Sequence, residues 1–461
     1  MKKTVSRRPA ANKTTVSLRC FEEKCRARYP ITDAKPFCPA CGGLLEVHYE
    51  WGDLDPEALK QRWRTRKMST DPRDLSGVWR FREMIPFLPP EARIVTLREG
   101  NTPLLDAPPS AAYADMESLR FKHQGFNPTG SFKDNGMTTG ISQAVALGRK
   151  VVACVSTGNT SASLAAYAAT GGLQAVILIP AGQVATGKLA QALEYGALTI
   201  QVETNFDGTW KLLSRLVEEA GVYLLNSVNP FRVEGQKTII VEMMEQLEWQ
   251  APDWIVLPGG NLGNCSAFGK ALREMRQLRL LDRMPRLAVI QAEGAAPLYQ
   301  LLQRAAAEKK APQELSLCPV ENPTTLATAI KIGAPVSWKK TLQEIEATRG
   351  VCEKVSEQEI ADAQAVIGRS GIGCEPASAA TLAGIRKLVA SNVIRKNDQV
   401  VAVLTGNLMK DPDYVLAYHQ GTLAFSVAGK QRPIESRFGN PPVSVPADVE
   451  SIKRLLVAGS K

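Results

Sequence analysis

The chain has 461 residues, of which 44% are hydrophobic and 22% charged, and its formal net charge is +10. This length predicts two or three domains, and the composition is ordinary for a globular protein. No stretch approaches the roughly 20 uncharged apolar residues of a membrane-spanning helix. The segment 1–17 is basic but lacks the apolar core of a secretory signal, so we expect a disordered tail there, with an organellar presequence as the alternative. Basic and aromatic residues do not interleave, which argues against a nucleic-acid partner.

Four of the nine cysteines crowd into one short segment near the N-terminus. Cys20 and Cys25 form one pair, and Cys38 and Cys41, followed by two glycines, form the other. Two such pairs can present four thiolates as a tetrahedron, which is the geometry that zinc prefers, and four thiolates leave no open position for catalysis. The spacing predicts a structural zinc site in a zinc-ribbon-like segment over 18–50, with four reduced cysteines in a small core as the alternative. The other five cysteines are scattered, which favours a reducing, cytoplasmic compartment over a disulfide framework.

Beyond a polar linking stretch from Trp51 to Arg93, apolar runs of strand length alternate with helical patterns. The predicted strands are Val151–Val155, Ala175–Ile179, Leu198–Val202, Trp254–Leu257, Leu287–Ile290 and Val400–Leu404. The predicted helices among them are Ser161–Ala169, Lys188–Tyr195 and Phe206–Ala220. This alternation predicts βαβ units and therefore an α/β body with parallel sheets in two packed lobes. Ligands bind beyond the carboxyl ends of such strands, so the loops at Ser156, Pro258 and Thr405 are candidate site loops.

Two strand-to-helix loops are suited to bind anions. The first, 156–161, reads Ser-Thr-Gly-Asn-Thr-Ser and opens a helix, so its backbone N–H groups can hold a carboxylate or a phosphate. Ordinary capping of that helix by its Ser, Thr or Asn residues is the alternative. The second, 258–264, reads Pro-Gly-Gly-Asn-Leu-Gly-Asn and lets backbone amides close around a phosphate, although a plain tight turn has the same composition.

A lysine stands at an unfavourable place in a third motif. Residues 127–134 read Asn-Pro-Thr-Gly-Ser-Phe-Lys-Asp, a turn in which Ser131 can cap a following helix. Lys133 would then lie in the first turn of that helix, where the helix dipole disfavours a cation. Lys133 is either a solvated charge balanced by Asp134 or an amine retained to condense with an aldehyde cofactor.

Taken together, these motifs resemble those of the pyridoxal-phosphate (PLP) enzymes of fold type II, the group of the tryptophan synthase β-subunit. Residues 131–134 resemble the Schiff-base motif, the loop 259–264 resembles the phosphate loop, and residues 373–380 resemble a further motif of the group. Within the group the threonine synthase family fits best, on the additional landmarks 98–104, 156–161, 226–238 and 404–412 and on the cysteine-rich segment. The resemblance covers residues 18–450 and departs at Asn135, where many relatives carry a basic residue.

The resemblance implies a two-lobed fold of type II, a homodimer and a role for each motif. The large PLP-binding domain would comprise 51–135 and 226–461, and the small α/β domain 136–225. Lys133 would carry PLP and shuttle protons. The other cofactor-binding residues would be Asn159, Gly260, Asn261, Leu262, Gly263, Asn264 and Thr405, with Asn159 at the ring hydroxyl and Thr405 at the ring nitrogen. The substrate carboxylate would lie on Ser156, Thr157 and Thr160, and the leaving phosphate on Lys188, Asn226, Ser227 and Arg232.

The implied reaction converts O-phospho-L-homoserine and water into L-threonine and phosphate. A neutral hydroxyl at Thr405 would not hold the ring nitrogen protonated as a carboxylate would, which suits elimination and replacement. Glu375 precedes Pro376 at a predicted helix start, where a carboxylate is favoured in any case, so no catalytic role is assigned to it. A related PLP enzyme, such as a threonine dehydratase or a cysteate synthase, is the alternative.

Overall fold

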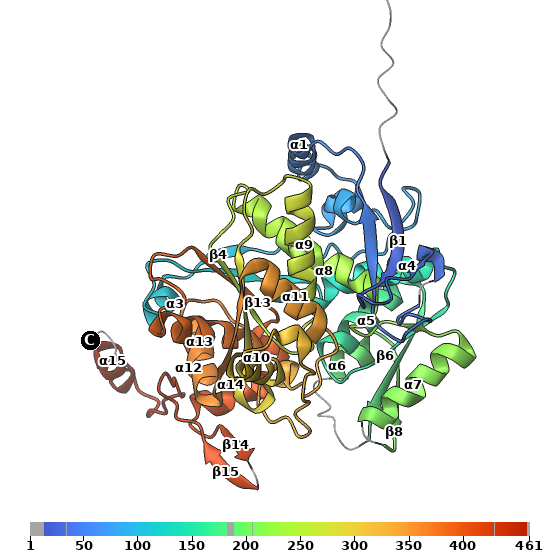
Figure 1. Ribbon diagram of the computed structural model, residues 1–461. Coiled ribbons are helices and arrows are strands. Elements are labelled where there is room, and N and C mark those ends of the chain that lie inside the picture. The colour runs from blue at the N-terminus through green and yellow to red at the C-terminus, as the bar shows by residue number, and fades with distance from the viewer. Residues whose placement is uncertain (1–12, 34, 182–188, 205, 428, 459–461) are drawn as a thin grey trace, which may run out of the picture.

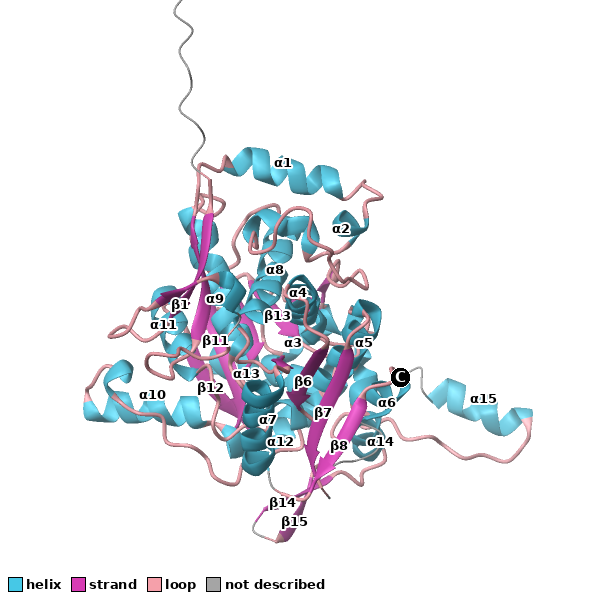
Figure 2. Ribbon diagram, turned by 90° about the vertical axis from the view of Figure 1, so that its right-hand side faces the viewer, coloured by secondary structure: helices cyan, strands magenta, loops and turns pink. Residues whose placement is uncertain are grey.

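The computed structural model describes residues 13–33, 35–181, 189–204, 206–427 and 429–458. Two sheets of parallel strands, each covered by helices on both faces, form the body of the molecule, and a small antiparallel sheet lies against it (Figures 1 and 2). The predicted α/β class with parallel sheets is confirmed. No helix in the described ranges is long and apolar enough to cross a membrane.

The N-terminal sheet has the strand order β2-β1-β3. Its strands are β1 (Thr15–Cys20), β2 (Arg28–Tyr29) and β3 (Leu45–Glu50). β1 pairs with β3 along its whole length, from Thr15 opposite Glu50 to Cys20 opposite Leu45. The prediction of a disordered tail over 1–17 was therefore wrong for residues 15–17, because their backbone groups find partners in β3. Residues 1–12 of that tail lie outside the described part of the chain.

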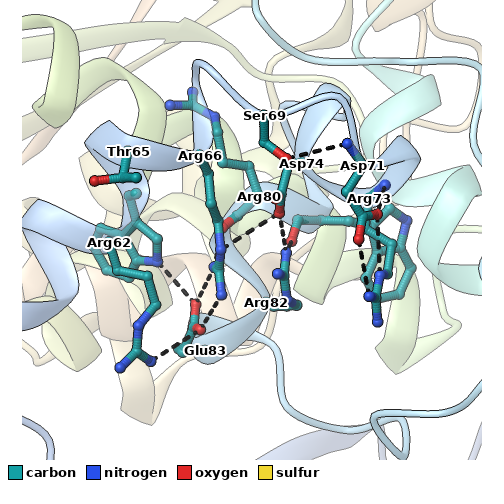
Figure 3. A network of polar contacts seen from close by, with 12 residues as sticks. Arg62, Thr65, Arg66, Ser69, Asp71, Arg73, Asp74, Arg80, Arg82 and Glu83 are labelled. Carbon is teal, nitrogen blue, oxygen red and sulfur yellow. Dashed lines mark hydrogen bonds and ion pairs between the residues drawn. The ribbon is translucent and has the colours of Figure 1, made fainter.

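The stretch from Trp51 to Arg93 is a folded cover rather than a simple link. It contains α1 (Pro56–Arg66), α2 (Pro72–Leu75) and the 3-10 helix η2 (Trp79–Met84). The side chains of Trp63 and Phe81 are fully buried in a core shared with later helices. A charged network joins the three helices: Glu83 accepts from Arg66 (2.6 and 2.7 Å), and Asp74 of α2 pairs with Arg66 (3.4 Å) and Arg82 (2.6 Å), as Figure 3 shows. Glu83 also accepts from Trp63 at 2.9 Å.

The larger sheet has six strands in the order β12-β11-β10-β13-β5-β4, all parallel except the edge strand β4. They are β4 (Leu104–Asp106), β5 (Arg120–His123), β10 (Trp254–Pro258), β11 (Arg286–Ala292), β12 (Val351–Val355) and β13 (Val400–Leu404). Its interior strands are buried on both faces, as parallel strands must be, so Val256 joins one apolar core and Ile255 and Leu257 join the other. The covering helices are α12 (Glu357–Arg369) and α13 (Pro376–Ala390) on the first face, and α8 (Pro230–Gln246) and α9 (Gly263–Gln277) on the second.

The smaller sheet has four parallel strands in the order β8-β7-β6-β9. They are β6 (Val151–Val155), β7 (Gln174–Pro180), β8 (Leu198–Val202) and β9 (Tyr223–Leu224). The helices packed on it are α4 (Lys133–Ala146), α5 (Asn159–Gly171), α6 (Ala190–Glu194) and α7 (Phe206–Ala220). Every strand predicted from the sequence is present in one of the two large sheets, with β6, β8 and β13 at the predicted bounds.

The remaining elements complete the surface. They are α3 (Pro108–Tyr113), α10 (Pro297–Glu308), α11 (Trp338–Thr348), α14 (Pro412–His419), the hairpin β14 (Ala424–Val427) and β15 (Lys430–Pro433), and α15 (Val449–Ala458). α15 stands away from the body at the end of an extended segment (Figures 1 and 2).

Candidate active site

Three chain segments meet beyond the carboxyl end of β13 and are joined there by backbone hydrogen bonds. The loop after β13 accepts at Thr405 O from Phe132 N (2.9 Å) and at Gly406 O from Glu375 N (3.1 Å). The turn before α4 and the turn before α13 therefore flank the same loop. This arrangement confirms that the predicted site loop at Thr405 adjoins the lysine motif.

Lys133 is the first residue of α4, as predicted. Ser131 was expected to cap this helix, but it does not: its hydroxyl is buried and has no hydrogen-bond partner among the described residues. The Lys133 Nζ atom lies 3.8 Å from the centre of the Phe132 ring. Burial and the neighbouring Arg232 guanidinium lower the pKa of Lys133 to about 7, although Glu375 opposes the shift. The amine is thus poised to be neutral and nucleophilic near pH 7.

Asp134 stabilises the turn in front of α4 rather than balancing a solvated lysine. Its buried carboxylate accepts hydrogen bonds from Thr129 N and Thr129 Oγ1, both at 2.7 Å, and from Ser163 Oγ at 2.6 Å. Ser163 belongs to α5, so Asp134 also connects the turn to the smaller sheet. Burial raises the pKa of Asp134 to about 6. Asn135, the departure from the family pattern, accepts from Asn127 Nδ2 at 3.2 Å within the same turn.

Glycines let α4 and α8 approach each other closely enough to place Arg232 beside Lys133. A Cβ atom on Gly235 would lie 1.8 Å from the carbonyl oxygen of Asn135, and one on Gly140 would lie 3.2 Å from Arg232 Cγ. Arg232 is 1% exposed, and its Nη1 donates to Leu225 O at 2.9 Å, while its Nε has no partner in the part of the chain that the structure describes. Burial lowers the pKa of Arg232 to about 10. The result is a buried cation with donor capacity left over.

The loop between β6 and α5 is less tightly held. α5 begins at Asn159 behind the N-cap Gly158, and no side chain caps it, so the capping alternative for this loop is not observed. Ser156, Thr157 and Thr160 are half-buried, and Ser156 Oγ accepts from Gly158 N at 3.3 Å. Within the described ranges, the hydroxyls of both threonines have no hydrogen-bond partner, which leaves them free to bind a ligand.

The end of β6 is supported by Asn226. The Asn226 side chain exchanges two hydrogen bonds of 3.0 Å with the backbone of Val155, directly before the β6–α5 loop. Its neighbour Ser227 accepts a hydrogen bond from Asn261 Nδ2, which brings this segment against the glycine loop. The predicted residue Lys188 lies outside the described residues.

The glycine loop leads from β10 into α9 with a backbone suited to an anion. Gly260 packs so closely that a Cβ atom would lie 3.0 Å from Ala329 O, and Leu262 adopts a left-handed conformation with φ of 64°. α9 begins at Gly263, and the first N–H groups of any helix lack intrahelical acceptors. Asn264 is buried, and its Oδ1 atom has no partner. These features match a helix N-terminus that binds a phosphate group.

Glu375 is the residue that the sequence reasoning missed. It is the N-cap of α13, as predicted, but its side chain makes no capping bond. Instead the carboxylate accepts from Asn159 Nδ2 (2.9 Å) and from Thr405 Oγ1 (3.1 Å), and burial raises its pKa. A residue before a proline has extended backbone, so its side chain can point away from the helix that follows. The Glu-Pro pair in the sequence could have indicated this orientation.

The site therefore contains buried polar atoms whose hydrogen-bonding capacity is unused among the described residues. Ser131 Oγ, Arg232 Nε and Asn264 Oδ1 are buried without hydrogen-bond partners among the described residues. Buried polar atoms normally find partners, so unpartnered atoms in the turn before α4, on α8 and at the start of α9 fit a site that binds a ligand. An aldehyde cofactor that also carries a phosphate fits the residues present, namely a lysine with a lowered pKa and a glycine loop at a helix N-terminus.

The four N-terminal cysteines also converge. Their Sγ atoms lie within 4.8 Å of one another, with Cys20 and Cys41 at 3.4 Å and Cys25 and Cys38 at 3.7 Å. Four thiolates at about 2.3 Å from a tetrahedral zinc ion are about 3.8 Å apart. The donor set and its spacing fit a zinc ion, and the geometry leaves no open coordination position.

Comparisons with known proteins agree with this geometry. The family model described as pyridoxal-phosphate dependent enzyme matches residues 95–406. Threonine synthase of Methanocaldococcus jannaschii is 40% identical over 439 residues, which are 95% of this chain and 98% of that protein. The chain belongs to the threonine synthase family of PLP-dependent enzymes. Threonine synthase of Methanosarcina acetivorans is 44% identical over 87% of this chain and 93% of its own length.

Solved structures show the same fold at lower sequence identity. Threonine synthase from Escherichia coli superposes with a TM-score of 0.65 at 15% identity, covering 96% of this chain and all of that one. Maize serine racemase superposes with a TM-score of 0.57 at 21% identity, covering 67% of this chain and 88% of that one. The fold type predicted from the motifs is thus confirmed, and the match to a threonine synthase extends over 95% of the chain, beyond the residues that the PLP family model matches.

Proposed function

We propose that the protein converts O-phospho-L-homoserine and water into L-threonine and phosphate. Membership of the threonine synthase family supports this reaction, and the placement of Arg232 is the structural observation that carries it. A buried guanidinium with an unpartnered Nε beside the reactive lysine is suited to a phosphate ester. Threonine, the substrate of a dehydratase, has no phosphate to pair with this buried charge.

The cofactor would be held by residues of both lobes. Lys133 would bind PLP covalently through its amine, and the backbone of residues 260–264 would hold the cofactor phosphate at the N-terminus of α9. Asn159 and Thr405 would lie against the ring. When bound, PLP supplies an electron sink for negative charge that develops on the substrate.

The side chains around Lys133 would orient the substrate and move its protons. Ser156, Thr157 and Thr160 would bind the carboxylate, with their free hydroxyls and the N–H groups that begin α5 as donors. Lys133, once its amine is free, would carry protons between Cα, Cβ and Cγ, because its lowered pKa allows both proton uptake and release near neutral pH.

The leaving phosphate would lie between α8 and the glycine loop. Arg232 supplies the charge there, and Asn226 and Ser227 lie in the segment that leads into α8. We assign Lys188 to the same phosphate on the family resemblance alone, because Lys188 lies outside the described residues. Because phosphate is the leaving group, Arg232 would stabilise the charge that develops on it as the bond to Cγ breaks.

The purified protein should be incubated with O-phosphohomoserine while threonine and phosphate are both measured. We expect the two products in equal amounts, and no turnover by Lys133→Ala. Rapid deamination of threonine with no release of phosphate from O-phosphohomoserine would instead support a dehydratase. Formation of cysteate from O-phosphoserine and sulfite, offered in place of O-phosphohomoserine and water, would support a cysteate synthase.

We further propose that Cys20, Cys25, Cys38 and Cys41 bind one structural zinc ion per chain. Metal analysis of the purified protein should find zinc, and replacing Cys38 by serine should remove it and destabilise the N-terminal sheet. Cys318→Ser, which changes an exposed cysteine outside the cluster, should leave the zinc content unchanged. Zinc-free protein with four titratable thiols in this segment would contradict the proposal.

The domain division, the homodimer and the cytoplasmic location remain proposals. We propose a large domain of 51–135 and 226–461 and a small domain of 136–225. Limited proteolysis and light scattering of the purified protein would test the division and the dimer.

A further inference from the structure

Glu375 joins the two lobes of the site through a single carboxylate. The residue is 4% exposed, and its two oxygen atoms accept from different lobes: Oε2 from Asn159 at the start of α5, and Oε1 from Thr405 beyond β13. A Cβ atom on Gly406 would lie 2.4 Å from Glu375 Cδ, so the carboxylate lies directly against the backbone of that glycine. Its position is therefore closely defined by packing as well as by hydrogen bonds.

The hydrogen bonds around Thr405 have a definite direction. Ser378 Oγ accepts from Thr405 N (2.8 Å) and from Gly406 N (3.1 Å), which occupies both of its lone pairs. The hydroxyl proton of Ser378 must then be donated, and Thr405 Oγ1 lies 3.0 Å away. Thr405 in turn donates its own proton to Glu375. A proton given to Glu375 cannot be given to a ligand at the same time.

We propose that Glu375 is a positioning residue that orients Asn159 and Thr405 toward the cofactor ring. The proposal rests on the assignment of these two residues to the ring. With both oxygens of the carboxylate occupied, Asn159 has one N–H group left for the ring. Thr405 presents a lone pair rather than a proton, so it can accept only from a protonated ring nitrogen, contrary to the unprotonated nitrogen expected from its neutral hydroxyl. Glu375 thus determines which hydrogen-bonding groups of Asn159 and Thr405 face the ring, without contacting the ring itself. It also adds a negative charge next to Lys133.

The test uses Glu375→Gln and needs no substrate. A neutral glutamine can accept only through its single carbonyl oxygen, so one of the two contacts is lost. We expect the affinity for PLP, measured by titrating the cofactor-free protein, to fall about 5- to 150-fold, the range for a buried hydrogen bond whose partner is left unpaired. The pH midpoint of the visible absorption band should also fall, because a negative charge that favours the protonated form has been removed.

Two further variants separate the effect of the Glu375 charge from the effect of its hydrogen bonds. Glu375→Asp restores the charge but is shorter by one methylene, so we expect the pH midpoint to return toward that of wild type while PLP affinity stays reduced. Combining Asn159→Ala with Glu375→Gln should weaken PLP binding less than the product of the two single effects, because the two side chains are hydrogen-bonded to each other and changes at contacting positions are not additive. If Glu375→Gln does not fold, the same comparison of single and double variants can be made with Glu375→Asp in its place.

Glu357→Gln is the matched control. Glu357 is also a buried carboxylate at the start of a helix of the same lobe, where it accepts from Leu326 N at 3.0 Å. It should leave the PLP affinity within twofold of wild type. The proposal is overturned if Glu375→Gln also stays within twofold with an unchanged absorption midpoint, or if its effect and that of Asn159→Ala simply multiply. A wild-type chain that binds no PLP would instead refute the cofactor assignment itself.

Discussion

The two turns that precede α4 and α5 bring different kinds of groups to the same site. The turn before α4 is held by buried bonds: Asp134 accepts three, and Asn127 Oδ1 accepts from Gly100 N at 2.8 Å. The loop before α5 is half-buried and keeps the Thr157 and Thr160 hydroxyls unpaired within the described ranges. A reactive amine benefits from a fixed position, whereas a loop that binds a substrate carboxylate needs donors that are still free. The difference predicts that changes in the first turn affect stability and chemistry, and that changes in the second affect the substrate.

The largest effect is expected at Lys133. Lys133→Ala should lose turnover by at least the upper end of the roughly 10²–10⁴-fold that a positioned proton-transfer group contributes. The protein should remain folded and can still bind PLP through the glycine loop. Borohydride treatment of the wild type should attach PLP to the peptide that contains Lys133. Attachment at the buried Lys122 instead would show that the wrong lysine has been assigned to the cofactor.

Arg232→Ala should follow in size. Loss of a charge-assisted contact costs about 2–5 kcal/mol when the partner charge stays buried, which is roughly 30- to several-thousand-fold in kcat/KM for O-phosphohomoserine. Part of the loss should be in kcat, because the phosphate is also the leaving group. The variant should still bind PLP, with the pH midpoint of its visible absorption band raised because a neighbouring positive charge has been removed. Any deamination of threonine should be nearly unchanged. An equal loss toward both substrates would show that Arg232 acts on the cofactor or the fold.

The comparison of the two turns is tested directly by one variant in each. Ser156→Ala should lower kcat/KM about 10- to 150-fold through the loss of a hydrogen bond to a charged carboxylate, with the free energy of unfolding within about 0.5 kcal/mol of wild type. Asp134→Asn should lower the free energy of unfolding by about 1–3 kcal/mol, because a buried donor is left unpaired. Denaturant unfolding and steady-state kinetics on both variants provide the measurements. The reverse pattern would contradict the comparison.

The smallest effect concerns pH. With a pKa of about 7, the Lys133 amine is mostly protonated at pH 6 and mostly neutral at pH 8. The rate at which cofactor-free protein takes up PLP covalently should therefore rise about tenfold between these values and then level off. A lysine with the ordinary pKa of about 10.4 would give a rate that keeps rising through pH 9. Stopped-flow absorbance distinguishes the two profiles.

Local sequence patterns were sufficient to predict much of this molecule. Apolar runs predicted β6, β7, β10, β11 and β13, because a parallel strand between two neighbours is buried on both faces and must be apolar throughout. The edge strand β8 was predicted as well, although most of it is exposed. Turn residues and the spacing of the motifs placed Lys133 at the start of α4. The cysteine pairs likewise indicated a four-sulfur cluster, because their ligands are close in sequence.

Only the tertiary structure decided which distant residues share the site. Glu375 and Asn159 are far apart in the chain and belong to different lobes, so no local pattern could show that they are hydrogen-bonded. Arg232 reaches Lys133 because Gly136, Gly140 and Gly235 let α4 and α8 come together, and a glycine in a sequence does not reveal which helix it faces. Ser131 and Glu375 both stand at helix starts, where capping was the local expectation. Neither side chain caps its helix: Ser131 Oγ is buried without a partner among the described residues, and Glu375 accepts from Asn159 and Thr405 instead, because packing between the lobes determined its surroundings.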